Sequence, residues 1–202
     1  MGKRATRQDE LARIGVAQPS GTRRRPGFGL IALAFYAAHA SYHLLHHHPE
    51  EVIWVCHVAT LLVGVGFLTA SATANGIAFL WLLMGDLLWG LDLASGGTLL
   101  PTSLLTHVGG LVLSIYGLLL YGMPRHVWWQ SVVAFLVLQQ VCRWITPAAS
   151  NVNVAFAVWD GWEAQFRSYH RYIAMLTALA LAVSFTVEQV TRRLLSRRVR
   201  AA

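Results

Sequence analysis

Long runs of uncharged, mostly apolar residues alternate along the chain with short polar segments. A helix that crosses the hydrocarbon core of a membrane needs roughly 20 such residues, because its backbone polar groups must be satisfied within the span. Six runs reach this length, and they cover residues 28–47, 51–70, 75–94, 101–121, 127–146 and 171–190. The pattern therefore predicts an all-α polytopic membrane protein that folds as a bundle of six transmembrane helices.

These runs divide the chain into three parts. Residues 1–27 form a basic tail, residues 28–190 form the transmembrane domain, and residues 191–202 form a second basic tail. Short connections join the spans, except for a longer outer loop over residues 147–170 between the last two. The expected organisation is one membrane domain with a tail at each end.

The composition agrees with a membrane protein and excludes an ordinary soluble domain. Apolar residues make up 55% of the chain and charged residues only 12%, whereas about a quarter of the residues in soluble domains are charged. The excess of 16 Lys and Arg over 9 Asp and Glu would also suit a nucleic-acid-binding protein. Because the cations lie mostly in two tails beside apolar spans, we expect contacts with anionic membrane lipids and no nucleic acid.

The positions of the charges predict how the helices are oriented. Most Lys and Arg residues lie in the two tails, and Arg125 lies in a loop on the same side. Positively charged residues that flank spans are retained in the cytoplasm, so both termini are expected on the cytoplasmic side of the membrane. An alternative is that the first span is a signal peptide cleaved near Ala38-His39-Ala40, which would leave five spans.

Histidine is as frequent in the chain as the acidic residues together, with nine of each. Ionisable groups inside a membrane span are costly and are therefore candidates for function. With a rise of about 1.5 Å per residue, a set of them falls roughly 6–12 Å below the outer ends of their spans. The set consists of His39, His43, Cys56, His57, Asp86 and His107. Their common depth predicts a polar cavity open to the outer side, although polar residues also gather near any membrane interface because they cost little there.

One chemistry for these groups is nucleophilic catalysis, in which an imidazole activates a thiol or hydroxyl and a third group orients the imidazole. Cys56 is then the nucleophile, and Thr60 is an alternative nucleophile one turn further along the helix. His107 is the general base and Asp86 orients it. With an acyl chain buried beside them, the protein would be a lipid acyl hydrolase or acyltransferase without a cofactor. The alternatives for Cys56 are apolar packing or a disulfide with Cys142.

A second chemistry is metal or haem binding. His39 and His43 are four residues apart on one helical face, and the run from His43 to His47 has the H-x2-HH spacing of membrane di-iron desaturases and hydroxylases. The cofactor would be zinc, iron or haem. The expected ligands are His39, His43, His57 and His107. For His46, His47 and His48, a solvated turn before Pro49 is the favoured interpretation.

The outer loop supplies further candidates. Asn151 or Asn153 could donate a hydrogen bond to an oxyanion. Trp159 and Trp162 fit an interfacial aromatic belt, which is typical of membrane proteins.

The order of these segments resembles YwaF-like bacterial integral membrane proteins and their eukaryotic transmembrane acyltransferase relatives. The resemblance covers about residues 50–156. It is carried by Trp54-Val-Cys56-His57, Leu80-Trp-Leu-Leu-Met-Gly-Asp-Leu-Leu-Trp89, Thr106-His107-Val-Gly109-Gly110, and Arg143-Trp-Ile-Thr-Pro followed by Asn151-Val-Asn153. It implies a catalytic Cys/His pair at Cys56 and His107. More remotely the chain is similar to the androgen-induced family of membrane hydrolases, which cleave lipid esters with a Thr/His pair.

A third interpretation involves no catalysis. The protein would be an accessory subunit of a larger membrane-protein complex, in which packing and interface effects explain the polar residues. This interpretation predicts co-purifying partners.

Overall fold

The computed structural model describes residues 23–201, so most of the predicted tail over residues 1–27 lies outside the described residues. The described part is helical and contains no strand. Its elements are α2 (Pro26–Leu45), η2 (Pro49–Ile53), α3 (Val55–Thr69), α4 (Ala72–Ala94), α5 (Pro101–Leu104), η3 (Leu105–Gly109), α6 (Gly110–Tyr121), α7 (Val127–Ile145), η4 (Ala148–Ser150), η5 (Val152–Val154) and α8 (Tyr169–Ala201). The prediction of an all-α protein is confirmed for these residues.

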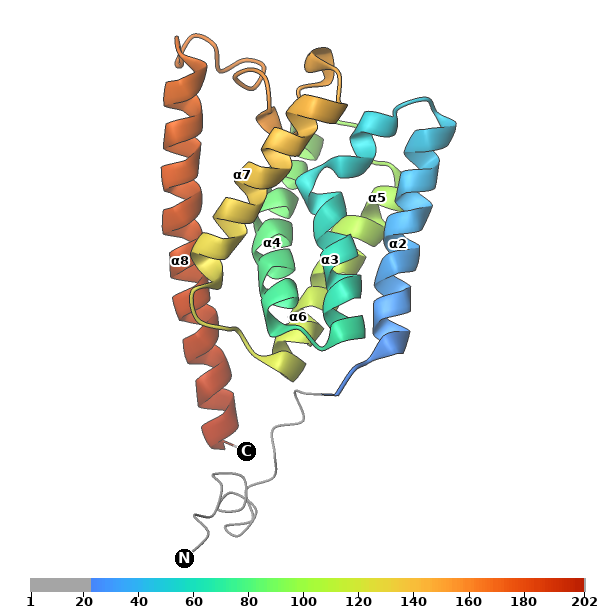
Figure 1. The fold of residues 1–202 in the computed structure, drawn as a ribbon, viewed down its shortest axis with the longest axis vertical. Coiled ribbons are helices and arrows are strands. Elements are labelled where there is room, and N and C mark those ends of the chain that lie inside the picture. Colours follow the sequence, from blue (N-terminus) through green and yellow to red (C-terminus); the bar gives the residue numbers. More distant parts are fainter. Residues whose placement is uncertain (1–22, 202) are drawn as a thin grey trace, which may run out of the picture.

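The long helices lie side by side in one bundle (Figure 1). Helix α3 packs between α2 and α4, and α6 packs against α3 and α4. Helix α7 crosses the bundle obliquely, and α8 packs along α7 at its edge. The first and last described residues lie at the same end of the bundle, which we call the tail end (Figure 1). The opposite end carries η2, α5 and the loop before α8, and we call it the loop end.

Within residues 23–201, four helices are long and apolar enough to cross a membrane. They are Pro26–Leu45, Ala72–Ala94, the continuous helix Pro101–Tyr121 and Tyr169–Arg197. The span predicted over residues 51–70 yields only the 15-residue α3, because Pro49–Ile53 forms a separate 3-10 turn. The span predicted over 127–146 is helical over Val127–Ile145 but is not among the four, since Gln130, Gln139, Gln140 and Arg143 interrupt its apolar residues.

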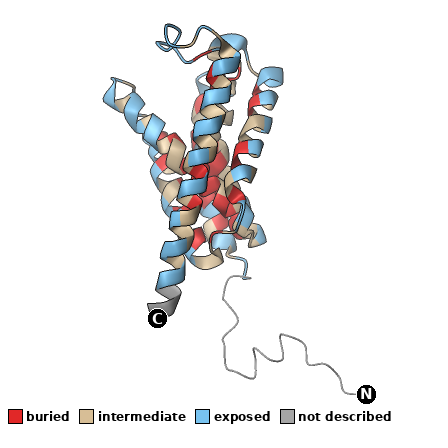
Figure 2. Ribbon diagram, turned by 90° about the vertical axis from the view of Figure 1, so that its left-hand side faces the viewer, coloured by how far each residue is buried: buried red, intermediate tan, exposed pale blue. Residues whose placement is uncertain are grey.

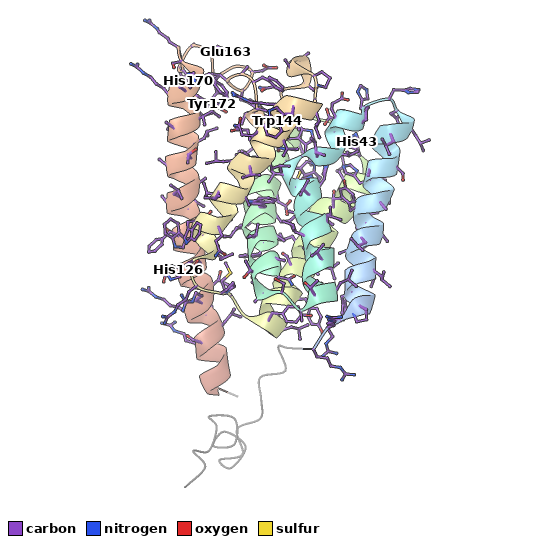
Figure 3. The ribbon with its side chains drawn as sticks, viewed as in Figure 1. His43, His126, Trp144, Glu163, His170 and Tyr172 are labelled. Atoms are coloured by element: carbon purple, nitrogen blue, oxygen red, sulfur yellow. The ribbon has the colours of Figure 1, made fainter. Side chains whose placement is uncertain are left out.

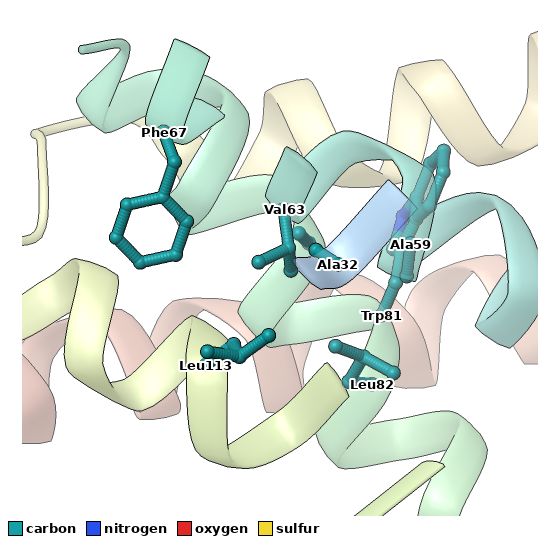
Figure 4. Packing of buried hydrophobic residues seen from close by; sticks show 8 residues of the cluster. Ala32, Ala59, Val63, Phe67, Trp81, Leu82 and Leu113 are labelled. Carbon is teal, nitrogen blue, oxygen red and sulfur yellow. The ribbon is translucent and has the colours of Figure 1, made fainter. Parts of the chain in front are cut away.

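Small residues at the helix contacts allow the bundle to pack closely. Ala32, Ala59, Ala78 and Val63 are fully buried beside larger side chains such as Phe67 (Figure 4). Gly64 allows α3 to approach α2, because a Cβ atom there would lie 2.7 Å from the Leu33 side chain. Close approach through small residues is a common way for membrane helices to associate.

The outward-facing surface of the bundle is largely apolar. Leu30, Leu88, Leu119 and Val137 are each at least 46% exposed, and exposed residues follow the outer faces of the helices while buried ones gather between them (Figure 2). A water-soluble bundle would place polar residues on these faces. The distribution therefore agrees with helices that contact lipid.

At the tail end, the buried carboxylate of Glu188 on α8 holds the start of α7. It accepts hydrogen bonds from the backbone N–H groups of His126 and Trp128, at 3.1 and 3.0 Å, and it pairs with Arg192 at 3.5 Å. Arg192 belongs to the basic tail predicted over residues 191–202. A carboxylate at a helix N-terminus also interacts favourably with the helix dipole.

We expect Glu188→Ala to lower the free energy of unfolding by about 1–3 kcal/mol, because two backbone donors lose their acceptor. Unfolding in detergent micelles, followed by tryptophan fluorescence, measures this change. The matched control is Glu163→Ala in the exposed loop before α8, for which we expect a change within about 0.5 kcal/mol. Equal stability of Glu188→Ala and the wild type would contradict the capping role.

Candidate functional site

Three imidazole rings meet near the loop end of the bundle. His39 and His43 project from α2 and His57 projects from the first turn of α3. The Nε2 atom of His39 lies 2.9 Å from Nε2 of His57 and 3.2 Å from Nε2 of His43. All three side chains are buried, with at most 9% of their surface exposed. We call these residues the tri-His cluster.

Two of these histidines, His57 and His39, also use their Nδ1 atoms to contact residues outside the cluster. His57 donates from Nδ1 to the backbone carbonyl of Glu51 at 2.8 Å. The direction is fixed, because a carbonyl can only accept. Neutral His57 therefore presents an unprotonated Nε2 to His39. The Nδ1 atom of His39 lies 2.9 Å from the hydroxyl of Thr102 in α5.

The two N···N contacts of the tri-His cluster cannot both be ordinary hydrogen bonds between neutral imidazoles. Because His57 carries its proton on Nδ1, a proton for the His39–His57 contact must come from His39. The same proton would then have to serve the His39–His43 contact as well. A cation placed between the three rings removes this conflict, since all three Nε2 atoms can then offer lone pairs.

The spacing of the nitrogens also suits a metal ion. Tetrahedral zinc with bonds of 2.0–2.1 Å places its ligand nitrogens roughly 3.3–3.4 Å apart. The ligand atoms of the tri-His cluster all lie within 4.8 Å of one another, so a small outward shift of the rings would admit an ion. Metal-ligating histidines usually bond a carbonyl, carboxylate or hydroxyl-like partner through their other nitrogen, and His57 and His39 both have such a partner.

Asp86 and His107, expected to act together, are in direct contact. The Asp86 carboxylate accepts a hydrogen bond from Nδ1 of His107 at 2.7 Å, which leaves Nε2 of His107 as the free nitrogen. Trp89, one turn beyond Asp86 on α4, stacks on the His107 ring with centroids 4.4 Å apart and planes 8° from parallel. The pair of contacts fixes both the tautomer and the plane of His107.

A wide helical turn holds His107 in place. Residues Leu105–Gly109 form a π-helical turn between α5 and α6, and such turns are frequent at functional sites. The carbonyl of Thr106 accepts a hydrogen bond from the Thr60 hydroxyl at 2.9 Å. Gly110 permits this contact, because a Cβ atom there would lie 2.5 Å from the Thr60 oxygen. Thr60 therefore braces the turn, and its hydroxyl is already engaged in that role.

His57 connects the two parts of the site. Its ring centroid lies 6.0 Å from that of His107, and one ligand atom each from Cys56, His57 and His107 lie within 4.8 Å of one another. The structure thus brings together all of the expected residues: the tri-His cluster on one side of His57, and Cys56, His107 and Asp86 on the other.

The two cysteines do not form the disulfide considered from the sequence. Cys56 and Cys142 are both free thiols. Cys142 lies on α7, where its sulfur accepts a hydrogen bond from the Asn153 amide at 3.2 Å. Cys56 packs its Cβ against Gly85 of α4. No hydrogen bond joins Cys56 to His107 within the described part of the chain.

The two loop asparagines, considered from the sequence as oxyanion donors, form structural hydrogen bonds. Asn153 accepts from the Val55 N–H and donates to the Ile53 carbonyl, both at 2.9 Å. It thereby fixes the start of α3, next to His57. Asn151 closes its own loop by accepting from Phe156 and Ala157.

A cavity of about 370 Å³ lies at the loop end, beside the tri-His cluster. It is lined by Tyr42, His43, His46, His48, Glu51 and Leu100. His46 and His47 form the turn expected between the first two helices, and they are exposed as expected. His43 lies close to the end of α2 at the edge of the bundle (Figure 3). Three histidines line the cavity. Of these, His43 was predicted to be a site residue, whereas His46 and His48 were predicted to belong to a solvated turn.

The sequence analysis did not identify three groups that contact the site histidines: the Thr102 hydroxyl, the Trp89 ring and the backbone carbonyl of Glu51. Trp89 could have been found, because it lies three residues after Asp86 and such residues share a helix face. The Thr102 hydroxyl and the Glu51 carbonyl carry no recognisable pattern.

Comparison of the chain with protein-family models, curated proteins and solved structures finds no match. The resemblance to YwaF-like proteins and to membrane hydrolases therefore stays a prediction. What the site can do follows from its own geometry.

Proposed function

We propose that the chain crosses a bacterial inner membrane six times, with both tails in the cytoplasm. The first and last described residues both lie at the tail end, which supports an even number of crossings. Helix α3 would span with about 22 Å of its own length, extended by η2. Helix α7 keeps one of its polar side chains out of lipid, because the buried Gln139 donates to the carbonyls of Asn153 and Val154.

Within this membrane domain, we propose that His39, His43 and His57 bind one divalent transition-metal ion, with zinc as the best fit. The observation that carries the proposal is the convergence of three buried Nε2 atoms. The Nε2 atom of neutral His57 is unprotonated, because its Nδ1 donates to a backbone carbonyl. Neutral imidazoles are good ligands for zinc, iron and copper. Three protein ligands leave the fourth position of a tetrahedral ion open, which is typical of catalytic zinc.

The open position and the Asp86–His107 pair together suggest hydrolysis. A metal ion makes its bound water a strong nucleophile near neutral pH. His39, His43 and His57 would hold the ion, Nε2 of His107 would accept a proton from the water that attacks an acyl carbonyl, and Asp86 would stabilise the resulting imidazolium. When the tetrahedral intermediate collapses, His107 returns the proton to the leaving alkoxide. The products are a carboxylic acid and an alcohol.

A membrane lipid ester is the substrate class that we propose. The site lies within the helical bundle, and Asp86 is flanked on α4 by the outward-facing Leu87, Leu88 and Leu91, which are each at least 64% exposed. The Asp86 side chain itself is 16% exposed. An acyl chain in the bilayer could therefore approach the pair from the side of α4.

The test begins with the metal. Protein purified in detergent without added chelator should contain about one zinc, iron or copper ion per chain by elemental analysis. Removal of the ion with a chelator should abolish release of fatty acid from a phospholipid or acylglycerol in mixed micelles, and re-addition should restore it. A chain that neither contains nor takes up metal would overturn the proposal.

Acyl transfer through Cys56 is the second candidate. The observation in its favour is the gathering of Cys56, His57 and His107 within 4.8 Å. The Cys56 thiol would take the acyl group from the lipid ester, and the lipid alcohol would leave with the proton that the thiol gives up. Water or a second alcohol would then take the acyl group from the thioester and restore the thiol. Unlike the metal mechanism, this route requires the Cys56 sulfur.

A further inference from the structure

The cavity at the loop end shares residues with the tri-His cluster. His43 lines the cavity and also directs its Nε2 atom at His39 inside the cluster. Glu51 also lines the cavity, and its backbone carbonyl holds His57. The buried cluster and the cavity are therefore separated by no more than the His43 ring.

The lining of the cavity carries ligands for a metal ion. His46 donates from Nδ1 to the carbonyl of Tyr42 at 2.8 Å, so its Nε2 atom is left as an unprotonated nitrogen. The His46 ring also stacks on Tyr42, with centroids 4.1 Å apart, which restricts its orientation. His48 is 64% exposed at the rim, and its Nδ1 atom lies 3.5 Å from the Glu50 carboxylate.

Resting on the proposed function, we infer that this cavity is the capture site through which a divalent transition-metal ion reaches the tri-His cluster. His48 and Glu51 attract the ion from solvent, His46 binds it transiently, and His43 passes it inward. His43 is suited to this step because it alone of the three cluster residues lines the cavity.

The histidines that line the cavity are less closely grouped than those of the tri-His cluster, which favours passage of an ion through the cavity over stable binding there. In residues 23–201, the ligand atoms of two groups gather within 4.8 Å, and neither group includes His46 or His48. An ion in the cavity would therefore have fewer simultaneous protein ligands than one in the tri-His cluster. Weak binding at the mouth and tight binding inside give a downhill path.

The experiment measures the rate of loading separately from affinity. Metal-free protein in detergent is mixed with Co²⁺, whose visible absorption reports nitrogen coordination, and the signal is followed over time. The variant is His46→Ala/His48→Ala. The matched control is His170→Ala, another exposed histidine at the loop end, which lies on α8 away from His43 (Figure 3).

We expect the double variant to load Co²⁺ about tenfold more slowly, a factor within the range that steering residues give association rates. Its final absorption spectrum and its equilibrium affinity should match the wild type, because the tri-His cluster is intact. By microscopic reversibility, release of Co²⁺ to excess chelator should slow by the same factor. His170→Ala should load at the wild-type rate.

Two results would overturn the inference, and they are distinguishable. Equal loading rates for the double variant and the wild type, with a normal final spectrum, would refute the capture site and leave the tri-His metal site in place. Failure of the wild type itself to bind Co²⁺ would refute the proposed function and the capture site together.

Discussion

The His57→Ala variant is expected to lose tight metal binding, with the largest effect of any single substitution in the site. His57 supplies the Nε2 atom whose lone pair is fixed by the Glu51 carbonyl, and it lies 2.9 Å from His39. Loss of an outer-shell partner alone costs a metal site about 10–100-fold in affinity, so loss of a direct ligand should cost at least about a hundredfold. Competition with a chromophoric chelator measures the affinity.

His126→Ala is the control for this experiment, because His126 lies at the tail end (Figure 3) and should leave metal affinity unchanged. Since His57 is only 6% exposed, helix content by circular dichroism and monodispersity in detergent must be compared for all three proteins. A well-folded His57→Ala protein with wild-type affinity would show that the metal does not bind at the tri-His cluster.

Asp86→Asn is expected to reduce hydrolysis of a lipid ester by about 10²–10⁴-fold, the usual contribution of a positioned general base. The carboxylate now accepts from Nδ1 of His107 at 2.7 Å. An amide can instead donate to Nδ1, which would place the imidazole proton on Nε2 and prevent His107 from accepting one. The rate of fatty-acid release at saturating substrate measures the effect.

Metal content separates this role from a structural one. Asp86→Asn should retain its metal, because Asp86 belongs to neither group of close ligand atoms. Asp92→Asn is the matched control, since Asp92 is exposed on the same helix, and it should be fully active. An active Asp86→Asn would contradict the general-base role of His107.

In the same assay, Cys56→Ala distinguishes metal-dependent hydrolysis from acyl transfer through Cys56, because only acyl transfer requires the Cys56 sulfur.

The helices and the depth of the site could be predicted from the sequence, because both depend on distance along the chain. The rise per residue places His39, His43, His57 and His107 at a similar level once the helix directions alternate. The contact between Asp86 and His107 could be anticipated only as a possibility, because it depends on how α4 and α6 are rotated about their axes.

The rotation of each helix about its axis and the choice of its neighbours could not be predicted from the sequence. They depend on close packing, such as the approach of α2 to α3 at Gly64. The start of α3 was placed four residues too early, because Val52 and Ile53 extend the apolar run although the backbone over Pro49–Ile53 forms a 3-10 turn. The structural roles of Asn151 and Asn153 could not be predicted, because most of their partners are backbone groups, which every sequence contains.

The bond from His57 to the Glu51 carbonyl has a consequence for heredity. The acceptor belongs to the main chain, so no substitution of the Glu51 side chain can delete it. Replacement of Glu51 by another residue is expected to leave the imidazole anchored, whereas insertion or loss of one residue between Pro49 and Ile53 is expected to displace the carbonyl. We therefore expect the length of this turn to vary less among related sequences than the identity of its residues.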